Sequence, residues 1–217
     1  MSRAPTAGPV IGIVVGLAAE ARIARPLGPV AIGGGLPAGA EAAAEHLVAR
    51  GVDGLISFGL AGGLDPALAA GAIVIPAMVL EDGHGFAADL TLAARFGGVM
   101  PMRALAGATV LADPDAKRAA RAATGAAVID LESGAVARVA ARHGLPFIVL
   151  RAVCDPASRA LPPLALAALD AGGRIGTGRI LASLLRHPGQ LPALFALARD
   201  AAHARAALRA AVQTAGP

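Results

Sequence analysis

The chain has 217 residues, a formal net charge of +4 and a sequence pI of about 10.8, and 56% of its residues are hydrophobic although only 2% are aromatic. This length suits one domain, and the scarcity of aromatic side chains and of Lys/Arg blocks argues against nucleic-acid binding. No stretch reaches the roughly 18 uninterrupted apolar residues of a membrane-spanning helix, and the single cysteine, Cys154, excludes an internal disulfide and fits a reducing compartment. We therefore predict one cytoplasmic domain over residues 1–217.

The first predicted element is a β-strand over Val10–Val15. Its β-branched run VIGIVV favours a strand over a signal peptide, although Arg3 precedes the run and an Ala-Glu-Ala sequence follows it. Residues 16–20 form the turn that leaves the C-terminal end of this strand. Glu20 in that turn has two interpretations: a first-turn helix glutamate that favours the helix dipole, or a functional carboxylate at the edge of the sheet.

A short strand over 30–35 and an alanine-rich helix over 38–50 are predicted next. The pattern Gly-x-Gly-x-x-Ala over 33–38 weakly resembles a dinucleotide-binding loop, and Asp53 lies 18 residues beyond its second glycine, near the distance expected of a ribose-binding acid. The alternative is a tight strand-to-helix turn, in which glycines allow close backbone approach.

A third strand over Val52–Phe58 runs into the glycine cluster Gly59–Leu64. Backbone N–H groups in such a cluster can face a ligand without interference from Cβ atoms. The cluster contains no basic residue and is not followed by Lys-Ser/Thr, so it is not a P-loop. Gly71–Val79 predicts another strand with an edge or bulge at Pro76, and Glu81–Asp89 predicts a polar loop.

Further along, 104–111 is predicted as a strand, and Asp113-Pro114 as the start of a basic helix through Arg121. Helices interrupted at 172–173 and 187–189 lead to a final helix over about 192–212. Its spacing of apolar and basic residues predicts a docked amphipathic helix with a solvated basic face, and the alternative is a membrane-facing helix.

The stretch Val128–Asp155 is the most informative part of the chain. It predicts a turn with two acids, a helix ended by Gly144, and a strand over 147–153 that is buried on both faces. Glu132 lies in the first helical turn and Asp155 just past the strand. Ligands of open α/β sheets bind where strands end, so both acids are functional candidates. The alternation of strands and helices along the whole chain predicts an α/β fold with helices on both faces of a sheet.

Four segments, in this order, resemble the nucleoside phosphorylase and nucleosidase superfamily. They are IGIVVGLAAEAR (11–22), ISFGLAGGLDPALAAGAIVI (56–75), VIDLESGAVARVA (128–140) and PFIVLRAVCDPA (146–157). They look similar to the methylthioadenosine/S-adenosylhomocysteine nucleosidase branch. Within it, DLES before GAVARVAARHGLPF, then RAVCDPA and RHPGQLPALFALARDA, resemble the hopanoid-associated nucleosidases, which are often labelled phosphorylases.

This resemblance spans about residues 10–210 and implies a three-layer α/β/α sandwich with a mixed central sheet, assembled as a homodimer. It implies hydrolysis of the N-glycosidic bond of an adenine nucleoside with a bulky apolar 5′ group, as in adenosylhopane of hopanoid biosynthesis. The substrate would be a small molecule, lipid-linked in that case, and the resemblance leaves peripheral membrane contact open. No metal or organic cofactor is expected.

The resemblance also assigns roles to individual residues. Glu20 matches the glutamate that activates the attacking water, and Asp155 matches the acid that protonates purine N7. Glu132 matches the glutamate that holds the ribose hydroxyls, and Arg151 an arginine near the nucleophile. The remaining substrate-binding candidates are Gly62 and Gly63 of the glycine loop, Ala61 and Leu131. In this scheme burial raises the pKa of Asp155, while Glu20 and Glu132 stay ionised.

Two departures from the family pattern keep alternatives open. Leu60 stands where the nucleosidases usually carry a small hydroxyl residue, and LADPDAKR (111–118) is a short base loop with no aromatic residue for adenine stacking. A phosphorylase would need cationic groups for phosphate, and Arg151 is the only arginine near the nucleophile position, so hydrolysis is favoured. A non-catalytic nucleoside- or lipid-binding homologue is the second alternative, and a dehydrogenase the third.

Overall fold

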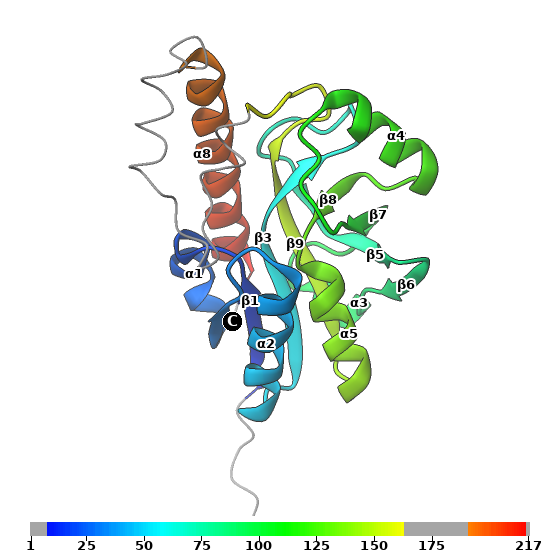
Figure 1. Ribbon diagram of the computed structural model, residues 1–217. Helices are drawn as coiled ribbons and strands as arrows, with labels where there is room; N and C mark the ends of the chain where they lie inside the picture. The colour runs from blue at the N-terminus through cyan, green and yellow to red at the C-terminus, as the bar shows by residue number, and fades with distance from the viewer. Residues whose placement is uncertain (1–7, 163–190, 216–217) are drawn as a thin grey trace, which may run out of the picture.

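The computed structural model describes residues 8–162 and 191–215 (Figure 1). The predicted interruptions at 172–173 and 187–189 lie outside the described residues. The strands are β1 (Ile11–Val15), β2 (Val30–Ile32), β3 (Gly54–Gly63), β4 (Ile73–Val74), β5 (Pro76–Glu81), β6 (His84–Ala87), β7 (Met100–Ala106), β8 (Val128–Asp130) and β9 (Phe147–Asp155). The α-helices are α1 (Ala18–Ala24), α2 (Pro37–Ala49), α3 (Leu90–Ala94), α4 (Pro114–Thr124), α5 (Ser133–His143) and α8 (Leu191–Thr214).

The strands form one mixed sheet centred on β3. Its path is β2-β1-β3-β8-β7-β5-β6, and β9 pairs with both β3 and β4. The first half of β3 lies parallel between β1 and β9, whereas its last residues, Gly62 and Gly63, pair antiparallel with β8. The long strand β3 therefore belongs both to the parallel part of the sheet, with β1 and β9, and to the part that contains β8, β7, β5 and β6.

Alternation along the central strands gives the sheet two buried faces. Val14, Leu55 and Val149 belong to one apolar cluster together with residues of α2 and α5. Ile13, Ile56 and Ile148, each one residue away, belong to a second cluster with residues of α1 and α8. Figure 1 shows α2 and α5 on one side of the strands and α1 with α8 on the other. The predicted three-layer α/β/α sandwich with a mixed sheet is confirmed.

Local signals placed several elements correctly. The Asp113 carboxylate accepts a hydrogen bond from the Asp115 backbone N–H (2.8 Å) and begins α4, as predicted from Asp-Pro. Gly144 adopts the left-handed conformation (φ 63°) that ends α5. The break predicted at Pro76 separates β4 from β5, and the pairing of β5 with β7 shifts register between Pro76 and Met78.

Three predicted boundaries are wrong. Gly59–Gly63 is not a loop but the second half of β3, because β9 and β8 both supply partners there. The polar loop over 81–89 is a hairpin of β5 and β6, whose turn residues Asp82 and Gly83 both have positive φ (47° and 79°). The strand predicted over 104–111 is β7, which ends at Ala106.

The dinucleotide-binding alternative does not fit the topology. Gly35 follows the C-terminal end of β2, whereas Asp53 precedes β3 and its carboxylate accepts a hydrogen bond from the Val10 backbone N–H (2.8 Å). Since β1, β2 and β3 are parallel, the glycines and the acid lie at opposite ends of the sheet. The dehydrogenase alternative loses its ribose-binding acid.

The last helix, α8, docks on β9 and α1 through Ala204, Leu208 and Val212, which are buried as amphipathic spacing predicts. Phe195, near its start, is exposed. Within the described ranges, no helix combines the length and hydropathy needed to cross a membrane.

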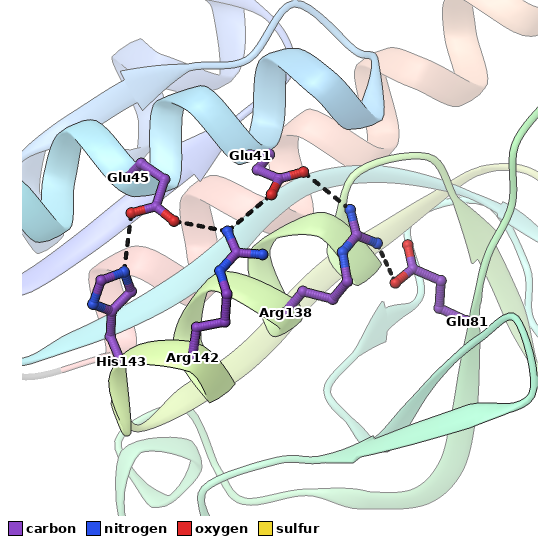
Figure 2. A network of polar contacts seen from close by, with 6 residues as sticks. All are labelled: Glu41, Glu45, Glu81, Arg138, Arg142 and His143. Carbon is purple, nitrogen blue, oxygen red and sulfur yellow. Dashed lines mark hydrogen bonds and ion pairs between the residues drawn. The ribbon is translucent and has the colours of Figure 1, made fainter.

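A polar network joins α2 to α5 above their apolar contact (Figure 2). The Arg142 guanidinium donates to Glu41 (2.8 Å) and to Glu45 (2.7 Å), and Arg138 links Glu41 to Glu81 of β5. Most of these side chains are at least one-third exposed, so water screens their attraction. Apolar residues beneath them, such as the fully buried Leu47, hold α2 in place.

We therefore expect Leu47→Ala to lower the free energy of unfolding by about 2–5 kcal/mol, since it removes buried area and leaves a cavity. Arg142→Ala should change it far less. Urea denaturation monitored by circular dichroism measures both. Equal losses from the two substitutions would mean that the ionic network, and not the apolar contact, attaches α2.

Candidate active site

A cavity of about 280 Å³ opens at the ends of β1, β8 and β9 and along the second half of β3. Its wall is mostly aliphatic: Leu17, Leu60, Val110, Leu111, Ile129, Leu131, Leu161 and Leu197 line it. Four acids lie in the same wall: Glu20, Asp130, Glu132 and Asp155. Two larger surface hollows, beside β6 and between α1 and α8, have no buried carboxylate in their described walls.

Glu20 is fixed by backbone donors. It sits in the first turn of α1 and is 3% exposed. One carboxylate oxygen accepts from the N–H groups of Gly16 (3.1 Å) and Leu17 (2.8 Å), and the other from that of Leu60 (3.0 Å). Burial raises the pKa of Glu20, and nearby Arg151 and these three donors oppose the rise. Glu20 is thus a helix-start glutamate that also lines the cavity.

Leu60 contributes to this arrangement through its backbone. Its side chain offers no hydroxyl, but its N–H reaches Glu20 across 40 residues of sequence. Glycine-cluster N–H groups were predicted to face a ligand. The N–H of Leu60 instead binds a carboxylate of the protein itself, which orients Glu20 toward the cavity.

Arg151 lies behind the carboxylates at 1% exposure. Its guanidinium donates to the hydroxyl of Ser57 (2.8 Å) and to Asp130 (2.9 Å), and it lies 3.7 Å from a Glu132 oxygen. Arg151 faces Gly59 on β3, where a Cβ atom would come within 2.6 Å of the guanidinium. Glycine is required there because only its backbone leaves room for the buried cation.

Asp130, the last residue of β8, binds the start of helix α5. One of its oxygens accepts from the backbone N–H groups of Glu132 (2.8 Å) and Ser133 (2.7 Å), which α5 leaves without helical partners, and from Arg151. The sequence showed Asp130 only as one of two acids in a turn. In the structure it holds the helix start and the buried arginine together.

Glu132 has a free acceptor. Its side chain is buried, and one oxygen has no hydrogen-bond partner among the described residues. Burial raises its pKa to about 7, with Glu20 and Asp130 adding to the rise and Arg151 opposing it. The prediction that Glu132 stays ionised therefore does not hold near pH 7, mainly because the carboxyl is buried and also because it lies beside Glu20 and Asp130.

Asp155 is the last residue of β9 and is 5% exposed. Lys117 of α4 binds one of its oxygens at 2.7 Å, and the thiol of Cys154 donates to the other at 3.1 Å. Burial raises the pKa of Asp155, as predicted, and the Lys117 ammonium works against that rise. The pairing of β3 with β9 shifts register between Ala61 and Gly62, so that Gly62 lies opposite Asp155.

The other predicted substrate-binding residues separate into two groups. Ala61, Gly62 and Leu131 line the cavity, as does Glu132. Gly63 does not: it lies against Pro156 and Ala157. Arg151 is not in the cavity wall. It lies behind three acids that are, Glu20, Asp130 and Glu132.

Several cavity residues were not identified from the sequence. Thr109, Val110 and Leu111 follow β7, within the stretch predicted as strand and just before the expected base loop, and they present aliphatic rather than aromatic surface. Leu161 and Leu197 close the cavity from the segment after β9 and from α8. They carry no motif, because only tertiary contact brings them to the site.

Comparison of the sequence with known families gives a match over part of the chain. A family model described as "Phosphorylase superfamily" matches residues 99–168. No curated protein matches the sequence.

Solved structures share the fold at low identity. S-adenosylhomocysteine nucleosidase from Streptococcus pyogenes superposes with a TM-score of 0.64 at 18% identity, covering 71% of this chain and 87% of its own. A Helicobacter pylori methylthioadenosine/S-adenosylhomocysteine nucleosidase mutant with 5′-methylthioadenosine in its active site gives 0.66 at 15%, covering 95% and 99%. Helicobacter pylori futalosine hydrolase gives 0.64 at 16%, covering 82% and 97%. The chain thus has the nucleosidase fold.

The raised pKa of Glu132 predicts a pH dependence of stability. A carboxyl with pKa 4.5 when unfolded and about 7 when folded contributes stability that is full below pH 4.5 and is lost as pH rises through 7. Glu132→Gln removes this contribution, which is on the order of a few kcal/mol. Between pH 5 and 8 the wild type should therefore lose more unfolding free energy than the variant. The raised pKa values of Glu20 and Asp155 also make the unfolding free energy fall with pH, but they do so equally in both proteins. The same pH dependence in the wild type and in Glu132→Gln would contradict the assignment to Glu132.

Proposed function

We propose that this protein hydrolyses the N-glycosidic bond of an adenine nucleoside. The observation that carries the proposal is the pair Glu20 and Asp155 in the wall of one aliphatic cavity, with the free oxygen of Glu132 in the same wall. Glycoside cleavage passes through an oxocarbenium-like state and needs a base for the attacking water and an acid for the leaving group. The fold shared with nucleosidases and the family model supports this reading.

Each acid has a distinct part in the proposed reaction. Glu20, held by three N–H donors, accepts a proton from the water that attacks C1′ of the ribose. Glu132 accepts hydrogen bonds from ribose hydroxyls through its free oxygen. Asp155 donates its proton to purine N7 as the C1′–N9 bond breaks, so that adenine leaves as a neutral base.

The surroundings of Arg151 favour water over phosphate as the nucleophile. Phosphate binding requires uncommitted cationic donors. The guanidinium of Arg151 already faces Asp130, Glu132 and Glu20, and it is 1% exposed. A phosphate beside these acids would meet more negative than positive charge. Hydrolysis is therefore the better-supported reaction, and phosphorolysis is the alternative.

Adenine release from 5′-methylthioadenosine tests the reaction directly. We expect turnover without phosphate, and Glu20→Gln or Asp155→Asn should each lower kcat by about 10²–10⁴-fold, since each removes one proton-transfer group. Chromatography of the base and sugar products, with and without phosphate, makes the measurement.

Other outcomes of this assay have clear meanings. A strict phosphate requirement with a sugar 1-phosphate product would establish a phosphorylase. Nucleoside binding without turnover, unchanged by either substitution, would establish a non-catalytic homologue. Arg118→Ala, on the exposed face of α4, serves as a control for the effect of substitution itself.

The aliphatic wall supports a substrate with an apolar 5′ group. Leu161 and Leu197 contribute to the described wall, and Val110 is 44% exposed beside it. Together with the sequence resemblance, this favours adenosylhopane, in hopanoid biosynthesis, as the substrate. A lipid-linked substrate is in keeping with peripheral membrane contact. The proposal takes residues 1–217 as one domain, acting as a homodimer in the cytoplasm without a metal or cofactor.

A series of 5′-substituted adenosines tests this substrate class. We expect kcat/KM to rise with the length of an apolar 5′ group, and Leu197→Ala to lower it about tenfold for long groups, because lost apolar contact is worth roughly 1–3 kcal/mol. Leu194→Ala, one turn earlier on α8 and outside the cavity wall, is the matched control. A much faster reaction of methylthioadenosine than of adenosylhopane would refute the hopanoid assignment.

A further inference from the structure

The sequence contains one lysine, Lys117, among its 19 basic residues, and that lysine is completely buried. Its side chain leaves α4 and ends at the carboxyl end of β9 (Lys117 Nζ to Asp155 Oδ2, 2.7 Å). A buried ammonium is costly unless it is paired and hydrogen-bonded. The contacts of Lys117 must therefore explain how a lysine is tolerated at this buried position.

The ammonium group has four acceptors at hydrogen-bond distance. Besides the Asp155 carboxylate, these are the backbone carbonyl oxygens of Asp155 (3.2 Å), Pro156 (3.2 Å) and Arg159 (3.1 Å). The first of these carbonyls belongs to the last residue of β9, and the other two belong to the segment that follows it. Lys117 therefore fixes both the Asp155 side chain and the backbone that carries it.

Only one oxygen of Asp155 remains for a ligand. Oδ2 is bound to Lys117, whereas among the described residues Oδ1 accepts only from the thiol of Cys154, which also lines the cavity. A thiol is a weak donor and gives way easily to a stronger partner. The contacts thus divide the two carboxyl oxygens between the protein and the cavity.

We propose that Lys117 is a positioning residue for the leaving-group acid: it fixes Oδ2 of Asp155, leaves Oδ1 for the purine base, and stabilises the carboxylate that forms when Asp155 gives up its proton. The inference rests on the proposed nucleosidase function. In the step itself, the Asp155 proton moves to N7, the electrons of the C1′–N9 bond stay with the base, and the new carboxylate stands beside the ammonium.

The charges around Asp155 show why such a partner matters. Burial and the nearby carboxylate of Asp200 in α8 raise the pKa of Asp155, and Lys117 and the Cys154 thiol lower it. Asp200 is itself paired with Arg159 at 2.7 Å. Without Lys117, the acid would hold its proton more firmly and its carboxylate would be left buried without a cation.

The test compares Lys117→Met, Lys117→Arg and Asp155→Asn, alone and combined. Lys117→Met should lower kcat about 10²-fold, and the basic limb of its kcat–pH profile should move to higher pH, because an acid that must be protonated then stays protonated longer. Lys117→Arg keeps the charge and should recover part of kcat with the limb unmoved. In the Asp155→Asn background, Lys117→Met should cause little further loss.

A ¹³C NMR titration of the Asp155 carboxyl provides a readout that does not depend on turnover. Its pKa should rise in Lys117→Met and stay near the wild-type value in Arg118→Met, a change at the next residue on the exposed face of α4. If the wild type shows no turnover, the nucleosidase proposal fails while this titration still tests the pairing.

Two results would overturn the inference. One is an unmoved basic limb and an unmoved carboxyl titration in Lys117→Met. The other is a Lys117→Met/Asp155→Asn protein whose loss equals the product of the single losses, which would make Lys117 a purely structural residue. Where Lys117→Met does not fold, the Lys117→Arg profile decides: a shifted limb despite the retained charge contradicts the proposal.

Discussion

The buried guanidinium of Arg151 is the interaction on which the rest of the site depends. It lies among acids that come from three different elements, Glu20 of α1, Asp130 before α5 and Glu132 at its start. Removing these charges from water costs several kcal/mol for each ion, and only a central cation with hydrogen bonds offsets that cost. The position of Arg151 on β9 therefore determines where the turn after β1 and the start of α5 can lie, and Gly59 gives it the space.

Sequence order accounts for much of the site. Glu20 follows β1 and Asp155 ends β9, and in an α/β sheet residues at such strand ends meet at one edge, so motif and topology together placed both in the cavity wall. The order of the sequence could not show which of the acids in the cavity wall are ionised. Whether Glu132 is ionised depends mainly on its burial, and then on the neighbouring acids and Arg151, all of which are properties of the folded arrangement.

What the sequence did not show follows a physical pattern. The continuation of β3 through glycines depends on partner strands, which no local signal reveals, whereas the Asp82-Gly83 turn of the β5–β6 hairpin is itself a local sequence signal. In the sequence, Lys117 appears only as part of a basic helix, because the periodicity of a helix does not show which long side chain points inward. Leu197 reaches the cavity from α8 through chain folding alone.

The burial of Lys117 has a consequence outside the reaction. Since it is the chain's only lysine, the native surface offers no lysine ε-amino group to acylating reagents, crosslinkers or acetylating enzymes, although it carries many arginines. All its side-chain basicity at the surface comes from guanidinium groups and histidines. Within residues 1–217, a reaction of an amine-directed reagent at Lys117 therefore reports that α4 has separated from β9.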